Sequence, residues 1–325
     1  MPSIRVSDDE FRDIWAKTMG SPASVAKLTG LPIRNVYKRR RNIERRENII
    51  LCGTAANSPD SGIDFHAEFP DWQEMEVKNG IIVAFSDSHL IPHRKSTAHK
   101  ALIKLVHELQ PDACVDMGDL LDFAAISRHH RIGWDKQYTV KEEVMWAKDC
   151  LDEITEAGPK RMKRKKTQGN HDQRFAGHLS NAQNAAAYEG LKGFNLVDHL
   201  EGWPVSWAIK VNGEELFISH RWKGGLHGPF NNTLWTGVSH ATGHQHKQQV
   251  YPLTDLRGDR WGVDVGCMSA IYSPHFRFME GRPRNYRSGF CVFRFVNYKL
   301  RHPQLVRVID EQKGLVEFNG RDIQV

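Results

Sequence analysis

One stretch decides the fold of this chain: Ile81-Ile82-Val83-Ala84-Phe85-Ser86-Asp87-Ser88-His89-Leu90. Its apolar first half predicts a buried β-strand. If the backbone stays extended beyond the strand, Asp87 and His89 point to the same side, because side chains alternate along a strand. A carboxylate and an imidazole held together in this way suit a divalent metal ion. A solvated loop can carry the same pair, so the downstream sequence has to decide between them.

The elements that follow predict a βαβ unit. Apolar residues at helical spacing predict a helix over residues 96–109, and a short apolar run predicts a strand over residues 113–117. The second strand leads directly into Asp119. Ligands of such sheets gather at the carboxyl ends of the strands, so we expect Asp87, His89 and Asp119 on one rim.

Two Asn-Gly pairs, at residues 79–80 and 212–213, lie between predicted strands. Asn-Gly is the strongest sequence signal for a two-residue β-hairpin. We therefore expect the 81–85 strand to pair with residues 75–78 through the first turn. The second turn is expected to join the two strands that precede His220.

The overall composition is that of a soluble globular protein. The chain has 325 residues, 40% of them hydrophobic and 26% charged. We find no apolar run of about 18 residues and no secretory signal, so we expect no membrane attachment. The five cysteines form no Cys-x-x-Cys pair and read as reduced thiols. Reduced thiols are typical of a reducing compartment, so we expect a cytoplasmic protein.

The net charge of +6 is concentrated in one segment, residues 34–46. This segment has seven basic residues and one acidic residue, Glu44, which gives +6 and leaves the rest of the chain neutral. Such a local excess indicates a polyanion-binding element. The candidate nucleic-acid contacts are Arg34, Lys38, Arg39, Arg40, Arg41, Arg45 and Arg46.

The N-terminal segment resembles a helix-turn-helix. A helix is predicted over residues 8–19, Ser21 and Pro22 predict the start of a second, and Gly30 opens a tight turn. The following helix, from Pro32, carries the basic cluster, as a recognition helix would. The alternative is a small helical module with a solvated basic face. We predict a DNA-binding domain over 1–50, a linker over 51–70 and a larger domain over 71–325.

Blocks of ligand-type residues follow one another between residues 75 and 270. They are Asp87-x-His89, Gly118-Asp119-x-x-Asp122, Gly169-Asn170-His171-Asp172, His220 and Gly243-His244-x-His246. This order resembles the calcineurin-like metallophosphoesterase superfamily, in particular its DNA-repair nucleases. The resemblance implies an α/β fold in which a β-sandwich is flanked by helices. The predicted fold is completed by the small all-α domain at the N-terminus.

The resemblance also implies two metal ions. The first would take Asp87, His89, Asp119 and His246, and the second would take Asp119, Asn170, His220 and His244. A bridging hydroxide would then attack phosphorus in line. We expect His244 and His246 to lie on one face of an extended strand. Mixed nitrogen and oxygen ligands favour Mn, Fe or Zn, and we favour Mn because similar nucleases use it.

The same resemblance assigns His171 to the leaving group, with Asp122 orienting it. Asp172 is expected to be structural. In the family an apolar strand precedes Gly169, but here the basic segment 160–166 takes its place. We expect that strand to be short, to lie at an edge of the sheet or to be mostly exposed. Alternatively, its charge adds a positive field next to the metal ligands. Weaker candidates for substrate contacts lie in loops near the ligands: Arg128, His129, His130, Arg131, Arg221 and Lys223.

Three functions fit these patterns. We expect foremost a metal-dependent phosphodiesterase that cuts nucleic acid, with DNA favoured. The alternative is a phosphomonoesterase acting on proteins or nucleotides at the same centre, because a fold does not fix a substrate. The second alternative is a DNA-binding regulator with an inactive metal domain. The fusion resembles prokaryotic and phage proteins, and the sequence leaves open a homo-oligomer or a partner ATPase.

Overall fold

The computed structural model describes residues 6–18, 21–47, 51, 69–128, 138–180, 193, 196–271, 276 and 285–325. The chain divides into two compact units, residues 1–66 and 67–325, each of which is described by itself. No helix in these ranges is long and apolar enough to cross a membrane. The sequence also predicts helical structure over residues 181–191, and these residues lie outside the described ranges.

The N-terminal unit contains α1 (Asp8–Lys17), α2 (Pro22–Thr29) and α3 (Ile33–Glu47). Ser21 caps α2 ahead of Pro22, as the sequence predicts, and Ser7 forms a capping box at the start of α1. Gly30 ends α2 with a φ of 67°, a left-handed conformation that favours glycine. The helices enclose a small apolar core of Phe11, Trp15, Val25, Val36 and Ile43.

Three arginines of the basic cluster on α3 form ion pairs within the N-terminal unit. Arg39 contacts Asp8 at 2.7 Å, and Arg46 contacts the same carboxylate at 2.8 Å. Arg40 pairs with Glu44 at 2.8 Å. Asp8 in the acidic first turn of α1 thus compensates Arg39 and Arg46, whereas Arg40 is compensated by Glu44 of α3 itself.

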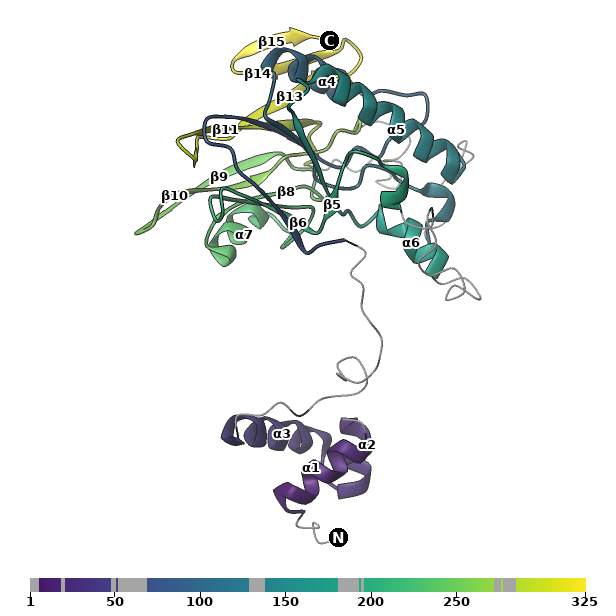
Figure 1. Ribbon diagram of the computed structural model, residues 1–325, viewed down its shortest axis with the longest axis vertical. Helices are drawn as coiled ribbons and strands as arrows, with labels where there is room; N and C mark the ends of the chain where they lie inside the picture. Colours follow the sequence, from purple (N-terminus) through teal and green to yellow (C-terminus); the bar gives the residue numbers. More distant parts are fainter. Residues whose placement is uncertain are drawn as a thin grey trace. The chain divides into compact units, whose positions relative to one another are not determined.

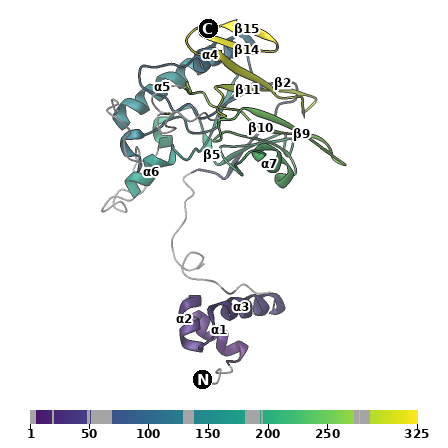
Figure 2. The same ribbon diagram turned by 180° about the vertical axis from the view of Figure 1, so that it is seen from behind.

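The larger unit is built on two β-sheets (Figures 1 and 2). The six-stranded sheet has the order β1 (Trp72–Met75), β6 (Ala208–Val211), β7 (Leu216–Ser219), β8 (Ser239–Thr242), β10 (Gly258–Asp264) and β9 (Gln249–Asp255). The second has the order β15 (Arg321–Gln324), β14 (Leu315–Phe318), β13 (Gln304–Asp310), β11 (Gly289–Val296), β2 (Gly80–Phe85), β3 (Ala113–Asp116), β4 (Lys163–Thr167) and β5 (Val205–Ser206), with β12 (Lys299–Leu300) pairing β11.

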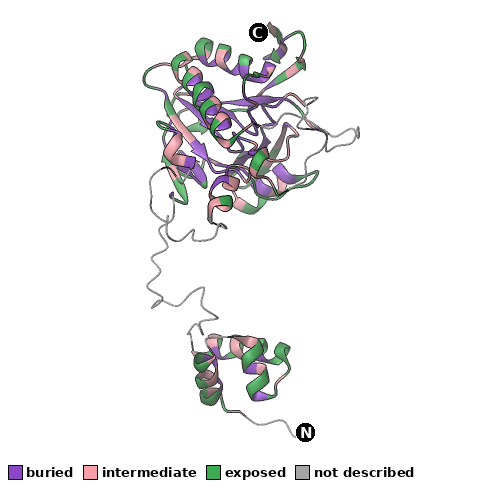
Figure 3. Cartoon of the chain, turned by 90° about the vertical axis from the view of Figure 1, so that its right-hand side faces the viewer, coloured by how far each residue is buried: buried purple, intermediate pink, exposed green. Residues whose placement is uncertain are grey.

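Helices cover the outer faces of these sheets. They are α4 (Thr97–Leu109), α5 (Val140–Ala157), α6 (Gln173–Ser180) and α7 (Gly228–Thr236), with short 3₁₀ turns at Ala124–Ile126 and Leu196–His199. One apolar core lies between the two sheets and contains Ile82 and Ala84 of β2. A second lies between the β2 sheet and helices α4 and α5, and contains Val83 and Phe85. Both faces of β2 are therefore buried, as its continuous apolar sequence predicts. Figure 3 shows that buried residues of the larger unit gather in its strands and on the inner sides of its helices.

The hairpin expected at residues 79–80 does not form. β1 pairs in parallel with β6, whereas β2 lies in the other sheet between β3 and β11. A type I′ turn needs a positive φ at both central residues, and neither Asn79 nor Gly80 has one. At residues 212–213 both φ angles are positive, 51° and 66°, and the expected antiparallel pairing of β6 with β7 is confirmed.

The basic strand before Gly169 is neither an edge nor an exposed strand, contrary to both of those expectations. β4 pairs with β3 on one side and with β5 on the other. Its last two residues, Lys166 and Thr167, are fully buried. The Lys166 ammonium is accommodated there because it lies 2.7 Å from both Asp116 and Asp172.

Candidate metal centre

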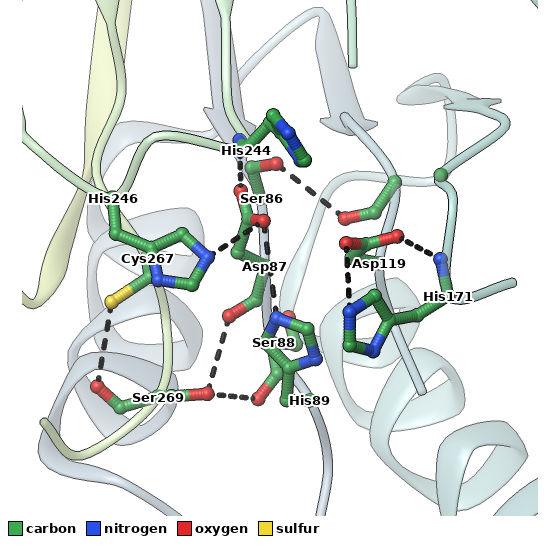
Figure 4. Close-up of polar contacts among 12 residues, drawn as sticks. Ser86, Asp87, Ser88, His89, Asp119, His171, His244, His246, Cys267 and Ser269 are labelled. Carbon is green, nitrogen blue, oxygen red and sulfur yellow. Dashed lines mark hydrogen bonds and ion pairs between the residues drawn. The ribbon is translucent and has the colours of Figure 1, made fainter. Parts of the chain in front are cut away.

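The ligand-type residues meet at one edge of the larger unit. Asp87 and His89 follow β2, Asp119 follows β3, Asn170 and His171 follow β4, His220 follows β7, and His244 and His246 follow β8. Their ligand atoms form three groups within 4.8 Å: Asp87, His89 and His246; His89, Asp119 and His171; and Asp119, His220 and His244. Figure 4 shows most of these side chains facing one another. The groups share members, so they form one centre.

Carboxylates of the centre lie against imidazoles. Asp87 Oδ1 is 2.9 Å from His246 Nε2 and 3.9 Å from His89 Nε2. Asp119 Oδ2 is 3.3 Å from His220 Nε2. The same His220 nitrogen lies 3.0 Å from the side-chain oxygen of Asn170, so the amide joins the second half of the centre.

The backbone is not extended at the ligand residues. The expectation of an extended backbone at Asp87-x-His89 and at His244-x-His246 is therefore wrong. Asp87, His89, Asp119, His244 and His246 have φ angles of 54°, 39°, 53°, 65° and 58°. A non-glycine residue in this left-handed region is uncommon, and a cluster of such residues is typical of a functional site. The sharp turns allow side chains from several loops to converge where straight strands would carry them apart.

Backbone hydrogen bonds stabilise these turns. The amide of Asp87 donates to the Gly118 carbonyl at 2.9 Å, and the amide of His89 donates to the Asp119 carbonyl at 3.1 Å. The amide of His244 donates to Asp87 Oδ2 at 2.7 Å. The ligand loops are thus tied to one another and do not depend on side-chain contacts alone.

Two glycines permit the loops to approach. A Cβ atom on Gly243 would lie 2.0 Å from Ser86 Oγ, and one on Gly169 would lie 2.1 Å from the Asp119 amide nitrogen. Both distances are far below van der Waals contact. The sequence motifs need glycine at these positions because a neighbouring ligand loop fills the space of the side chain.

The electrostatics fit a centre that accepts positive charge. Burial would raise the pKa of Asp87, but the adjacent His246 lowers that pKa well below its ordinary value. Burial likewise would raise the pKa of Asp119, and His220 lowers it. Burial lowers the pKa of His220, yet Asp119 raises it to about 9. The two carboxylates therefore favour positive charge beside them, and a metal ion bound by the imidazoles could supply that charge in place of the protons on His220 and His246.

The imidazoles are also oriented for ligation. His220 Nδ1 donates to the Met117 carbonyl at 2.9 Å, which directs Nε2 towards Asp119 and Asn170. His246 Nδ1 is buried and has no hydrogen-bond partner among the described residues. Two carboxylates, an amide oxygen and converging imidazoles are a donor set that Mn, Fe and Zn accept. The residues therefore fit a divalent metal centre.

His171 is held at the side of this centre. Its Nδ1 lies 2.8 Å from Asp122 Oδ1, and its Nε2 lies 4.0 Å from Asp119 Oδ2. Arg174, which the sequence reasoning missed, approaches the same Nε2 at 3.2 Å and donates to the Asp122 carbonyl at 2.6 Å. Its spacing of three residues from His171, at the start of α6, could have indicated this contact.

A buried ion cluster lies beneath the ligand loops. Asp172 accepts hydrogen bonds from the amides of Asp119 and Gly169, at 3.1 and 3.2 Å, and from Lys166 Nζ at 2.7 Å. Burial would lower the pKa of Lys166, but Asp116 and Asp172 raise it above its ordinary value. Asp172 has the structural position expected of it. Lys166 was missed as a participant because basic residues in a run usually face solvent.

The remaining candidates are more dispersed. Arg128, Arg221 and Lys223 are exposed, with Arg221 directly after His220. Residues 129–131, which include the candidates His129, His130 and Arg131, lie outside the described residues. The basic residues of α3 belong to the other unit.

The larger unit has an α/β fold in which two sheets are covered by helices and the ligand-type residues converge at one edge. No protein-family model matches the chain. The chain is 27% identical over 271 residues to Gene 54 protein of Mycobacterium phage L5, covering 74% of this chain and 97% of the phage protein.

Two solved structures of Vps29, from different organisms, match part of the chain. A single mutant of Vps29 from Entamoeba histolytica matches with a TM-score of 0.39 and 13% identity, covering 75% of this chain and 99% of that chain. Vps29 from Chaetomium thermophilum matches with a TM-score of 0.40 and 11% identity, covering 75% and 96%.

Proposed function

We propose that this protein is a metal-dependent phosphodiesterase that hydrolyses nucleic acid, with DNA as the favoured substrate. The observation that carries the proposal is the convergence of Asp87, Asp119 and their histidines into ligand groups that overlap at His89 and at Asp119, with Asp119 belonging to two of them. Two cations close together need an anion between them, and the shared carboxylate meets that need.

The ligand groups supply two positions for divalent ions. Asp87, His89, Asp119 and His246 would hold one ion, and Asp119, Asn170, His220 and His244 would hold the other. Bound divalent ions supply positive charge to a phosphate and lower the pKa of water. We propose Mn²⁺ as the resident ion, with Fe²⁺ and Zn²⁺ as alternatives.

His171 would transfer a proton to the leaving oxygen. Its Nδ1–H donates to Asp122, which fixes the ring and turns Nε2 towards the centre. Arg174, whose guanidinium donates to Nε2 at 3.2 Å, places a positive charge beside the same position and would release Nε2 when that nitrogen carries the proton. The pair would neutralise the charge that develops on the leaving group.

The exposed side of α3 supports a nucleic-acid substrate. Arg34, Lys38, Arg41 and Arg45 are spaced by four, three and four residues, so they lie on one face of the helix, where Tyr37 joins them in a surface groove. These four cations form no ion pair with any described residue, unlike Arg39, Arg40 and Arg46. An unpaired row of cations is suited to phosphates.

The proposed function is tested by Mn²⁺-dependent hydrolysis of a phosphodiester dye, a phosphomonoester dye, and linear and circular DNA. We expect cleavage of the diester and of DNA, and loss of both in Asp119→Asn. Asp322→Asn, an exposed aspartate on β15, is the matched control and should retain activity.

Each contrary result has a distinct meaning. Monoester hydrolysis without diester or DNA cleavage would replace the proposal with a phosphomonoesterase. Absence of all hydrolysis in protein that has bound Mn²⁺ and DNA would support a regulator with an inactive metal domain.

A further inference from the structure

Beside the metal centre lies a surface of exposed aromatic and basic side chains, which we call the tryptophan surface. It is formed by the loop after His220 and by helix α7, which packs on β8, β9 and β10 (Figure 1). Its members are Arg221, Trp222, Lys223, Leu226, Leu234 and Trp235.

The apolar members of this surface are unusually accessible. Trp235 is 70% exposed, Leu226 is 63% exposed and Trp222 is 53% exposed. A soluble protein leaves large apolar side chains grouped in this way mainly where something binds. Single exposed residues would need no such explanation, but these three come from one loop and the helix that follows it.

Hydrogen bonds fix the loop to α7. The amide of Lys223 donates to the Asn232 side chain at 2.9 Å, and the Asn232 amide group donates back to the Lys223 carbonyl at 3.3 Å. Lys223 Nζ lies 3.3 Å from the centroid of the Trp235 ring. The cation and the aromatic ring are thus presented together on an ordered surface.

The loop is also tied to the metal-ligand loops. It begins immediately after His220, and the amide of Gly225 donates to the side chain of Gln245 at 3.3 Å. Gln245 stands between His244 and His246, and Lys247 Nζ donates to the Gly225 carbonyl at 2.7 Å. A polymer positioned at the centre would therefore pass next to this surface.

We infer that the tryptophan surface binds unpaired nucleobases of a single-stranded stretch of the substrate. The inference rests on the proposed nuclease function and specifies its substrate. Tryptophan rings stack on any base, while Arg221 and Lys223 complement the phosphates. Bases inside a duplex are already stacked on one another, so only unpaired bases can use these rings.

The test is binding of labelled single strands to the full-length protein in chelator, measured by fluorescence anisotropy. An oligothymidylate is compared with an abasic strand of equal length, because both carry the same phosphates and only one carries bases. We expect the wild-type protein to prefer the oligothymidylate, and Trp235→Leu and Trp222→Leu each to reduce that preference about tenfold. Trp235→Tyr should restore most of it, because tyrosine retains an aromatic face.

The matched control is Trp72→Leu. Trp72 is 48% exposed and also has a lysine over its ring, with Lys210 Nζ 3.7 Å from the centroid, but β1 lies at the opposite edge of the six-stranded sheet from β9. This variant should keep the preference for bases. Circular dichroism and thermal melting of all variants would show that they are folded.

Different results would overturn this inference and the proposed function. Equal binding of the two strands, or a preference that survives in both tryptophan variants, would overturn the inference and favour a protein partner for this surface. A preference for bases without Mn²⁺-dependent cleavage would overturn the nuclease function and leave the base-binding surface in place.

Discussion

Lys166 Nζ lies 2.7 Å from Asp172 Oδ2, and both side chains are completely buried beneath the metal-ligand loops. Asp172 in turn accepts the amide of Asp119, the shared ligand. A buried ion pair contributes little net stability when complete, but removal of one partner leaves an uncompensated charge. The pair therefore links the stability of the larger unit to the geometry of its centre.

Lys166→Met should be strongly destabilising. It leaves the Asp116 and Asp172 carboxylates buried without their cation, which costs on the order of 3–5 kcal/mol. We expect a large fall in the urea midpoint of unfolding. Lys163→Met, at an exposed position of the same strand, is the control and should change the midpoint little. An unchanged midpoint in Lys166→Met would contradict the role given to the cluster.

His171→Gln should lower kcat by about 10²- to 10⁴-fold, the usual contribution of a general acid. Metal content should stay the same, because His171 is oriented by Asp122 and is not one of the ligands assigned to either ion. Steady-state kinetics and elemental analysis of the same preparation measure both quantities. His178→Gln, exposed on α6, is the control. Loss of metal from His171→Gln would instead identify the histidine as a ligand.

Removing an exposed cation from α3 should change the salt dependence of DNA binding more than removing an ion-paired one. Lys38→Gln removes an exposed charge and should weaken DNA binding and reduce the salt slope of log Kd by about 1. Arg40→Gln removes a side chain that pairs with Glu44 and packs over Trp15. Its effect on the salt slope should be much smaller. Equal slopes for the two variants would mean that α3 does not present one face to phosphates.

Much of the larger unit could be predicted from its sequence because local chemistry and tertiary structure agree. The apolar run of β2 lies between two cores, and the ligand blocks follow strands that end at one edge. The basic strand β4 could not be predicted, because only the fold brings Asp116 and Asp172 to Lys166. Charge compensation between distant residues leaves no local pattern.

The two Asn-Gly pairs also show that contacts with distant residues can override a local sequence preference. Asn212 and Gly213 take left-handed angles and join β6 to β7, as their local preference predicts. Asn79 instead accepts the amide of Asn297 at 2.8 Å, and the Ile81 amide donates to Asp112 at 3.0 Å. Contacts with distant residues replace the hairpin, because β2 gains a fully buried position in the other sheet.

His240 provides a pH-dependent test of the core of the larger unit. It is fully buried on β8, with Nε2 2.9 Å from Ser219 Oγ, and burial lowers its pKa from 6.5 to about 4. The folded state therefore disfavours the charged ring. As pH falls below 6.5, the unfolded state binds a proton that the folded state does not, so stability decreases until pH reaches about 4.

The full shift corresponds to about 3 kcal/mol, of which about 2 kcal/mol is lost by pH 5. His240→Gln keeps a polar group near Ser219 and removes the titration. Urea unfolding of both proteins at pH 7.5 and pH 5 should show a smaller loss of stability between the two pH values in the variant. At pH 7.5 the variant itself should have a lower free energy of unfolding than the wild type. Other groups that titrate in this range contribute equally to both proteins, so they cancel in the difference. Parallel losses in the two proteins would show that His240 is able to accept its proton within the folded structure.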